Sequence, residues 1–325
     1  MSQGFGFNSY VGIGEEVTFG TAVTRTKFFE VNDDSIEGKQ TLMSKPSLRG
    51  TSQDRRLQGK KDVGGSLKFP LGFEGYEKVL KHAFGTLAAV SGVGPYTHAY
   101  TLAAALPAGL TIECTKASSD IDSGTASAHI FEGCKINKMT LTQAVDEFLM
   151  ASVDIIGEDW NLAAPSGAPT FPTFNGIDWS MLGTMTLAGV AIVDILKGFE
   201  FSIDNGLAGD RYLFGTRVRK PIVRNQQRKI TMKLTLDYDA LAEYNYFLAQ
   251  TTLIAFVATW DNGLLTTSNK KFNISCPKVA VQDPGLKVSE PGPLGLELGL
   301  EAFISSAQLD EMTAYLINSN SVSQA

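Results

Sequence analysis

A strand-like segment followed by a helix-like segment occurs twice in the chain, and this repeat limits the possible folds more than any other feature. The first copy covers residues 67–71 and 73–84, and the second, which starts 165 residues later, covers 232–236 and 238–249. In both copies the apolar residues stand two apart and then three or four apart, the change of period that separates a strand from a helix. The repeat predicts two units in which one helix packs on a sheet.

The similarity continues on both sides of the repeated segments. The first expected helix has an apolar stripe of Tyr76, Val79 and Ala83, and the residues at the same offset in the second are Leu241, Tyr244 and Leu248. Strand-like runs precede the two copies at 28–31 and 198–201. Further expected strands, rich in Thr, Val, Ile and Phe or with alternating apolar residues, are 109–114, 129–134, 147–156, 252–260, 271–276 and 294–304.

These elements predict a mainly β protein with two similar tandem domains and one flanking helix in each. The expected boundaries are 1–162 for the first domain with an N-terminal arm, 163–176 for a linker that contains Pro and Gly, and 177–325 for the second domain. A length of 325 residues suits two domains, because each is then large enough to bury its own core. The alternative is a chance similarity between two β-rich domains.

Two long polar loops, at 37–61 and 205–229, carry 14 of the 28 basic residues. The chain has a net charge of −6 and the two loops together carry +11, so the remainder carries −17. Loops of about 25 residues without evident structure are usually functional, and extended hairpins are the form expected here. The basic residues of the two loops are Lys39, Lys45, Arg49, Arg55, Arg56, Lys60 and Lys61 in the first, and Arg211, Arg217, Arg219, Lys220, Arg224, Arg228 and Lys229 in the second.

Three interpretations of these loops are open. They are solvated surface loops, they bind nucleic acid through Lys and Arg clusters, or they dock on the acidic bodies of neighbouring copies of the chain. The acidic remainder and a pI of about 5.2 oppose DNA binding, because they repel phosphate at long range. We favour contacts between subunits or between rings of subunits, since this interpretation accounts for both signs of charge.

Residues capable of nucleophilic or metal chemistry do not form a recognisable arrangement. The histidines lack HExxH or HxH spacing, and His82 is expected at the surface or boundary of the first helix. An odd number of widely spaced cysteines excludes a disulfide framework, and buried or half-buried free thiols are expected. These cysteines are Cys114, Cys134 and Cys276.

Motifs for phosphate binding, targeting or membrane insertion are also missing. The glycine pairs near the start complete neither GxGxxG nor GK[ST], and the carboxylates of Glu158 and Asp159 lie in turn-like surroundings where solvation explains them. Residues 1–10 lack the basic start and apolar run of a secretory signal, and the best apolar run, 181–196, is broken by Gly and Asp. We therefore expect a cytoplasmic chain with no enzyme activity, cofactor, metal or membrane insertion.

The N-terminal sequence resembles that of a known protein family. Residues 10–23, YVGIGEEVTFGTAV, followed by Lys27, Phe28 and Phe29, resemble the start of the tail tube proteins of siphophages, the long-tailed bacteriophages. The run GFEFSIDNG at 198–206 is similar to the strand that precedes a long loop in the same proteins. The N-terminal run is the most specific part of a resemblance that extends loosely over both halves.

The resemblance implies a fold, a function and partners. The implied fold is a β-sandwich with a flanking helix, whose sheets join in a ring to form a large β-barrel around a channel. The implied function is that of a structural virion protein, the major tail tube subunit, which polymerises into stacked rings for genome ejection. The implied partners are other copies and tail proteins such as the tape measure, terminator and distal tail proteins, while viral DNA passes through the lumen without specific binding. A tail terminator, a baseplate hub ring and a DNA-binding module are the alternatives.

The repeat also bears on the number of chains in a ring. Rings in this family are built on six tube domains, so a chain with two such domains closes a ring as a homotrimer with true threefold and approximate sixfold symmetry. The alternative is six chains in each ring, with one half of every chain outside the barrel.

Four carboxylates are candidates for the channel wall. Alternation in the last expected strand places Leu296, Leu298 and Leu300 on one face and Glu297 and Glu301 on the other, and by the same period Asp154 and Glu158 share a face. We predict that some of the four acids face the lumen and keep DNA from binding. The alternative is an acidic outer surface. The four residues are Asp154, Glu158, Glu297 and Glu301.

Overall fold

The computed structural model describes residues 9–44, 56–92, 95–115, 128–167, 169–238, 242–248, 253–263, 269–282, 294–303 and 312–321. Within these residues the chain forms 19 strands, two α-helices and two short 3-10 helices. The helices are α1 (Glu77–Phe84), α2 (Ala242–Leu248), η1 (Trp179–Met181) and η2 (Val193–Ile195). The strands are β1 (Val11–Glu16), β2 (Lys27–Phe29), β3 (Asp33–Asp34), β4 (Glu37–Ser44), β5 (Arg56–Pro70), β6 (Gly85–Ser91), β7 (Tyr96–Leu102), β8 (Gly109–Thr115), β9 (Ala128–Ala144), β10 (Met150–Gly157), β11 (Asp159–Ala163), β12 (Leu182–Leu187), β13 (Val190–Ala191), β14 (Leu196–Asp204), β15 (Lys229–Asp237), β16 (Ile254–Asp261), β17 (Lys271–Val281), β18 (Gly295–Ala302) and β19 (Thr313–Asn318).

The expected mainly β fold is confirmed. The predicted strands at 109–114 and 252–260 correspond to β8 and β16, and the run at 129–134 is the first part of the longer β9. Helix α1 is shorter than predicted, and the second helix is described only over 242–248. Helix α1 begins at Glu77 instead of residue 73, because Gly75 in the preceding turn has a φ of +93°, which a helix does not accommodate.

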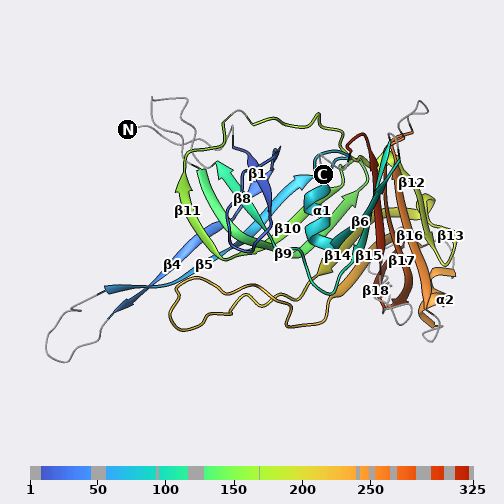
Figure 1. Cartoon of the computed structure of the whole chain (residues 1–325). Coiled ribbons are helices and arrows are strands. Elements are labelled where there is room, and N and C mark those ends of the chain that lie inside the picture. Colours follow the sequence, from blue (N-terminus) through green and yellow to red (C-terminus); the bar gives the residue numbers. More distant parts are fainter. Residues whose placement is uncertain are drawn as a thin grey trace.

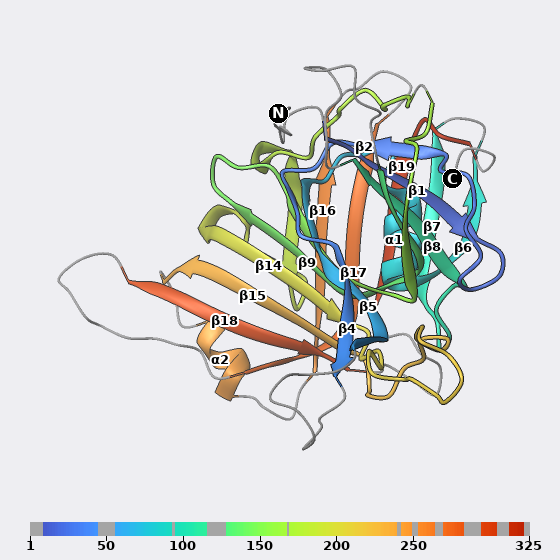
Figure 2. The ribbon, with the colours of Figure 1, turned by 90° about the vertical axis from the view of Figure 1, so that its left-hand side faces the viewer.

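A main antiparallel sheet runs through both halves of the chain in the order β4, β5, β10, β9, β14, β15, β18 (Figures 1 and 2). Its inner face is apolar because successive residues of a strand alternate between faces. One row of directly paired core residues consists of Phe69, Ala151, Leu141, Phe201, Met232 and Leu300. All are at most 3% exposed. Burial of each large apolar side chain contributes about 1.5–3 kcal/mol.

A second set of strands packs against the main sheet in each half. In the N-terminal half the pairing order is β1, β8, β9, β11, and in the C-terminal half it is β12, β16, β17, β19. The main sheet has matching orders as well, with β4, β5, β10, β9 in one half and β14, β15, β18, β17 in the other. The hairpin of β6 and β7 has no counterpart among the described residues of the C-terminal half.

The two halves are joined by strand pairs. Strand β9 pairs with β14 along 138–144 and 198–204, which makes the main sheet continuous, and β7 pairs with β19. Because the strands pair along these seams, neither half presents a free edge to the other there.

The two α-helices differ in their surroundings. Helix α1 lies between the layers (Figure 1), and its predicted stripe of Tyr76, Val79 and Ala83 is buried. Leu241 lies outside the described residues, and Leu248 in α2 is 63% exposed, so the prediction of an equivalent buried stripe was wrong at Leu248. The prediction for His82 was also wrong, because this side chain is 2% exposed. The three cysteines are buried free thiols, as expected.

Candidate assembly and channel surfaces

The outer face of the main sheet is a continuous polar surface. Residues that are directly paired on neighbouring strands have their side chains on the same face of the sheet. One row consists of Asp33, Lys68, Ser152, Thr140, Ser202, Thr231 and Glu301. A neighbouring row consists of Ser66, Asp154, Lys138, Asp204 and Lys229. The first row crosses seven strands and the second crosses five, so hydroxyl groups and charges of both signs cover this face, which we call the polar face.

Charges on the polar face are largely balanced by opposite charges. The ammonium of Lys68 is 3.5 Å from the Asp33 carboxylate, and that of Lys233 is 2.9 Å from Glu297. Lys138 is the register partner of both Asp154 and Asp204 on its two sides. Balanced pairs reduce the field that the polar face projects into solvent, because opposite charges a few Å apart cancel at distances beyond their separation.

Three of the four predicted channel acids lie on the polar face. Asp154 and Glu297 are exposed there, and Glu301 is half-buried beside Lys229, at 3.4 Å. Glu200 also lies on this face, and sequence reasoning missed it. Its outward position could have been predicted from alternation, because Glu200 stands between Phe199 and Phe201 in β14, and both of these apolar side chains are buried.

Glu158 lies apart from the other three acids. It follows directly after β10 and lies against Gly20 and Gly133, near the 3% exposed carboxylate of Glu16. Burial and the neighbouring carboxylates of Asp159, Glu16 and Glu132 raise the pKa of Glu158. Glu158 thus lies in the expected turn-like bend but is half-buried there, while Asp159 forms an ion pair with Lys61 at 2.6 Å.

The first basic loop forms the hairpin of β4 and β5, which projects from the body (Figure 1). We call this hairpin the first arm. Lys45, Arg49 and Arg55 lie outside the described residues, so their predicted contacts stay predictions. Lys39 pairs with Glu37 on the exposed strand β4, and Arg56 is exposed at the start of β5. Lys60 lies 4.8 Å from the ring centroid of Tyr212, a cation–π contact with the second loop.

The second basic loop lies between β14 and β15 and forms an irregular hairpin at 205–228, as expected, although it contains no named strand: the amides of Ala208 and Lys220 donate to the carbonyl oxygens of Val223 and Arg211. We call it the second arm, and it lies along the base of the first arm (Figure 1). Arg219 is 4% exposed and donates hydrogen bonds to the carbonyl oxygens of Val63, at 3.0 Å, and Gly157, at 2.5 Å, and to the Asp62 carboxylate. Alternation along the chain could not reveal this contact, because its partners are distant in sequence.

Other basic residues of the second arm also bind the N-terminal half. Arg217 donates to Gln58 at 3.0 Å, and the guanidinium groups of Arg224 and Arg228 donate to the carbonyl oxygens of Ala104, at 3.0 Å, and Ala103, at 2.5 Å. Three predicted residues of the second loop remain. Arg211 donates to the carbonyl oxygen of Pro221 within the arm, and Lys220 lies near Glu158. Lys229, the first residue of β15, pairs with Glu301. Most of the predicted docking residues thus already bind their own chain.

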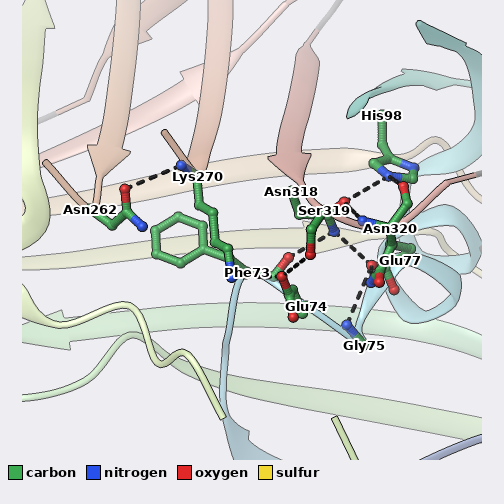
Figure 3. A network of polar contacts seen from close by, with 10 residues as sticks. All are labelled: Phe73, Glu74, Gly75, Glu77, His98, Asn262, Lys270, Asn318, Ser319 and Asn320. Carbon is green, nitrogen blue, oxygen red and sulfur yellow. Dashed lines mark hydrogen bonds and ion pairs between the residues drawn. The ribbon is translucent and has the colours of Figure 1, made fainter. Parts of the chain in front are cut away.

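A polar network at the other side of α1 joins the end of β19 to the turn before α1 (Figure 3). The buried amide of Asn318 donates to the carbonyl oxygen of Phe73 at 2.8 Å and to Glu77 at 2.6 Å, and its oxygen lies 3.0 Å from the Nε2 atom of His98. Beside it, Lys270 and Glu74 form an ion pair at 2.6 Å in which both side chains are largely buried. These contacts fix the two halves to each other.

A second buried contact involves the histidine of α1. The Nε2 atom of His82 is 3.4 Å from the Glu15 carboxylate, which Lys81 also contacts. These contacts lower the pKa of Glu15 to about 2, while burial lowers the pKa of His82. Among the described residues, no group of three or more His, Cys, Asp or Glu is arranged to hold a metal ion. Neither described helix has the length and apolar character needed to span a bilayer.

The described residues thus form a continuous polar sheet face over an apolar core, with two arms that contact each other. Comparison with protein families gives the class of the protein, a structural one, because the family model described as phage tail tube protein matches residues 6–302. The chain belongs to this family and is a structural component of a phage tail. No curated protein matches its sequence.

Proposed function

We propose that the chain is the major tail tube subunit and that three copies close one ring of the tube. Each half of the chain is one tube domain, with β4, β5, β10 and β9 in the first and β14, β15, β18 and β17 in the second. The observation that carries this proposal is the seam between β9 and β14, where the last main-sheet strand of one half pairs with the first strand of the other. The same contact, repeated between copies, joins the end of β17 at Ala280 and Val281, beyond its pairing with β16, to the edge formed by β3 and β4.

The repeated seam closes the sheet into a barrel. Four main-sheet strands from each of six halves give about 24 strands, and barrels of 16–18 strands already enclose an aqueous channel. Strands spaced about 4.8 Å apart and tilted by about 40° give a backbone diameter of about 48 Å, enough for duplex DNA between the side chains. Closure also pairs the strand edges that a single chain exposes, and so removes an aggregation hazard.

The polar face lines the channel in this assembly. Hydroxyl groups and paired charges offer DNA no cluster of free cations, so the genome passes without being held. Rings assemble in the host cytoplasm and stack into a tube within the virion tail. The tape measure, terminator and distal tail proteins are the partners at the lumen and the two ends.

The proposal is tested by imaging the purified chain at high concentration and weighing its rings by native mass spectrometry. Stacked rings of three chains with approximate sixfold symmetry are expected. Six chains in each ring would contradict the equivalence of the two halves. Single rings that never stack would favour a terminator or hub ring, and a chain that forms neither rings nor tubes would exclude the proposed function.

A further inference from the structure

The two ends of the main sheet carry different apolar features. Both arms leave the sheet at one end, where β14 ends at Asp204 and β15 begins at Lys229. The opposite end contains Pro70, Met150 and Gly198, and the segment 169–178 reaches it, where Gly176 and Asp178 form bridges to Gly72 and Phe148. Figures 1 and 2 both show this segment and the arms on opposite sides of the molecule. A contact between the two ends therefore requires two copies of the chain.

The end opposite the arms holds an aromatic pocket of about 280 Å³. Phe29 and Tyr76 line it from the core, with ring centroids 5.5 Å apart, while Phe171 and Phe174 line its outer side and are 44% and 50% exposed. Phe174 is held by an edge contact with the ring of Phe148, at 5.7 Å. Two carboxylates also line the pocket: Glu74, which is paired with Lys270, and the exposed Glu30. We call this site the aromatic pocket.

The second arm ends in the most exposed aromatic side chain among the described residues. Phe214 is 108% exposed and the adjacent Leu213 is 55% exposed. The chain turns there, and Gly215 has a φ of +90°. Because Arg219 anchors the arm to Val63 and Gly157, the loop that carries Phe214 is held in place from its own base. An exposed ring on an anchored loop has the character of an interface anchor, since such residues lose little conformational freedom on binding.

We propose that Phe214 of one copy inserts into the aromatic pocket of a copy in the next ring. This inference rests on the proposed function and names the surfaces that stack the rings. The charges around the two surfaces are complementary, because Arg211 and Arg217 flank Phe214 and Glu30 is exposed at the pocket. The insertion buries an aromatic ring against other aromatic rings, where edge and offset contacts add to apolar burial.

A second pocket lies at the same end of the C-terminal half and is the weaker partner. It has a volume of about 220 Å³ and is lined by Trp179, Leu182, Val193 and Leu196, with Lys197 in place of a carboxylate. This lysine is paired with Asp237, so among its lining residues the second pocket offers no carboxylate to the arginines that flank Phe214. The acidic aromatic pocket is therefore assigned to the second arm.

This contact explains how a tube grows without limit while each ring closes. Phe214 and the aromatic pocket are different surfaces at opposite ends of one chain, so their contact is head-to-tail and leaves a free pocket at one end of every stack. The seam proposed between β17 and the edge of β3 and β4 acts around the ring instead, where rotation closes it. Stacking and ring closure thus use separate residues.

Photo-crosslinking tests the contact in assembled tubes. Phe214 is replaced by benzoylphenylalanine, and chains labelled with heavy and light nitrogen are mixed before assembly and irradiation. We expect crosslinks from position 214 to peptides that contain Phe171, Phe174 or Tyr76 of a different copy, in tubes but not in dissociated chains. Crosslinks to any other segment, or only within one copy, would overturn the inference while the tube function stands. A chain that forms neither rings nor tubes overturns the proposed function and this inference with it.

Substitutions test the same contact without a probe. F214S should leave folding and ring closure unchanged and raise the concentration needed for tube formation at least about tenfold, as loss of a central aromatic anchor does. F174S in the pocket should have the same effect, and the double variant should be no worse than either single variant. V223S, at an exposed apolar position of the same arm, is the matched control and should stack normally. Normal tube formation by F214S would overturn the inference.

Discussion

The guanidinium group of Arg219 donates a 3.0 Å hydrogen bond to the carbonyl oxygen of Val63, and so ties an arm of the C-terminal half to a strand of the N-terminal half. The arginine is 4% exposed and shares its donors among two carbonyl oxygens and the Asp62 carboxylate. A buried guanidinium is stable only when its donors are paired in this way. The second arm is therefore part of the folded subunit before any assembly contact forms.

Removal of this anchor should destabilise the free subunit. We expect Arg219→Ala to lower the free energy of unfolding by about 2–4 kcal/mol, because the carbonyl oxygens of Val63 and Gly157 lose a charged donor and remain largely buried. Chemical unfolding of the dissociated chain measures the change. Arg211→Ala is the control, since this exposed arginine bonds only within the arm, and its effect should stay within about 0.5 kcal/mol. Equal effects of the two variants would contradict the anchor.

The polar network beside α1 makes a second prediction about the junction of the halves. Asn318→Ala should lower the free energy of unfolding by about 3 kcal/mol, because it removes the donor to Phe73 and Glu77 and the acceptor beside His98 from a buried site. Thermal unfolding is the measurement. Asn225→Ala, at an exposed position of the second arm, should have little effect. An unchanged unfolding temperature of Asn318→Ala would contradict the prediction and would mean that water replaces the hydrogen bonds of the amide.

The difference between what could and could not be predicted from the sequence has a physical cause. Alternation is local, so the burial of Leu296, Leu298 and Leu300 and the outward position of Glu297 followed from neighbouring residues alone. The same local signal placed Asp154 on an exposed face. The mainly β class could be predicted for the same reason.

Contacts between distant segments have no such local signal. Arg219 stands among exposed residues of a basic loop, and nothing near it indicates that Val63, 156 residues away, would cover it. The burial of His82 likewise depends on packing against residues such as Glu15 in the N-terminal strand. In each case tertiary packing, not the pattern of the surrounding sequence, determined the side chain's environment.

Acid pH should weaken the packing of β1 against α1. Burial holds the pKa of His82 in the folded chain below the ordinary value of 6.5, which applies to the unfolded chain. As pH falls through 6.5, the unfolded chain therefore binds a proton before the folded chain does, and the free energy of unfolding falls. The pKa of Glu15 is lowered to about 2 from 4.5, so its contribution is present above 4.5 and is lost as pH falls toward 2. The titration of His82 and that of Glu15 therefore both lower the free energy of unfolding as pH falls.

Unfolding midpoints between pH 7.5 and pH 5 measure the histidine contribution. His82→Gln, which removes the titrating group, should reduce the loss of stability over this interval. An identical slope in the variant and the natural chain would assign the pH dependence to other groups. Glu15→Gln is the matched variant for the lower interval, where it should flatten the further loss between pH 4.5 and pH 2.

The polar face makes the last prediction, which concerns passage of DNA. Asp154→Lys places a cation beside Lys138 on an exposed position of this face, so the fold and the tubes should be unchanged. If the face lines the channel, each ring gains three free cations, and duplex DNA that enters a tube should be retained at low salt and released as salt rises. Asp194→Lys makes the same charge change at an exposed position in η2, outside the polar face. Tubes of both variants are compared for salt-dependent retention of short labelled duplexes, and equal retention would place the polar face away from the channel.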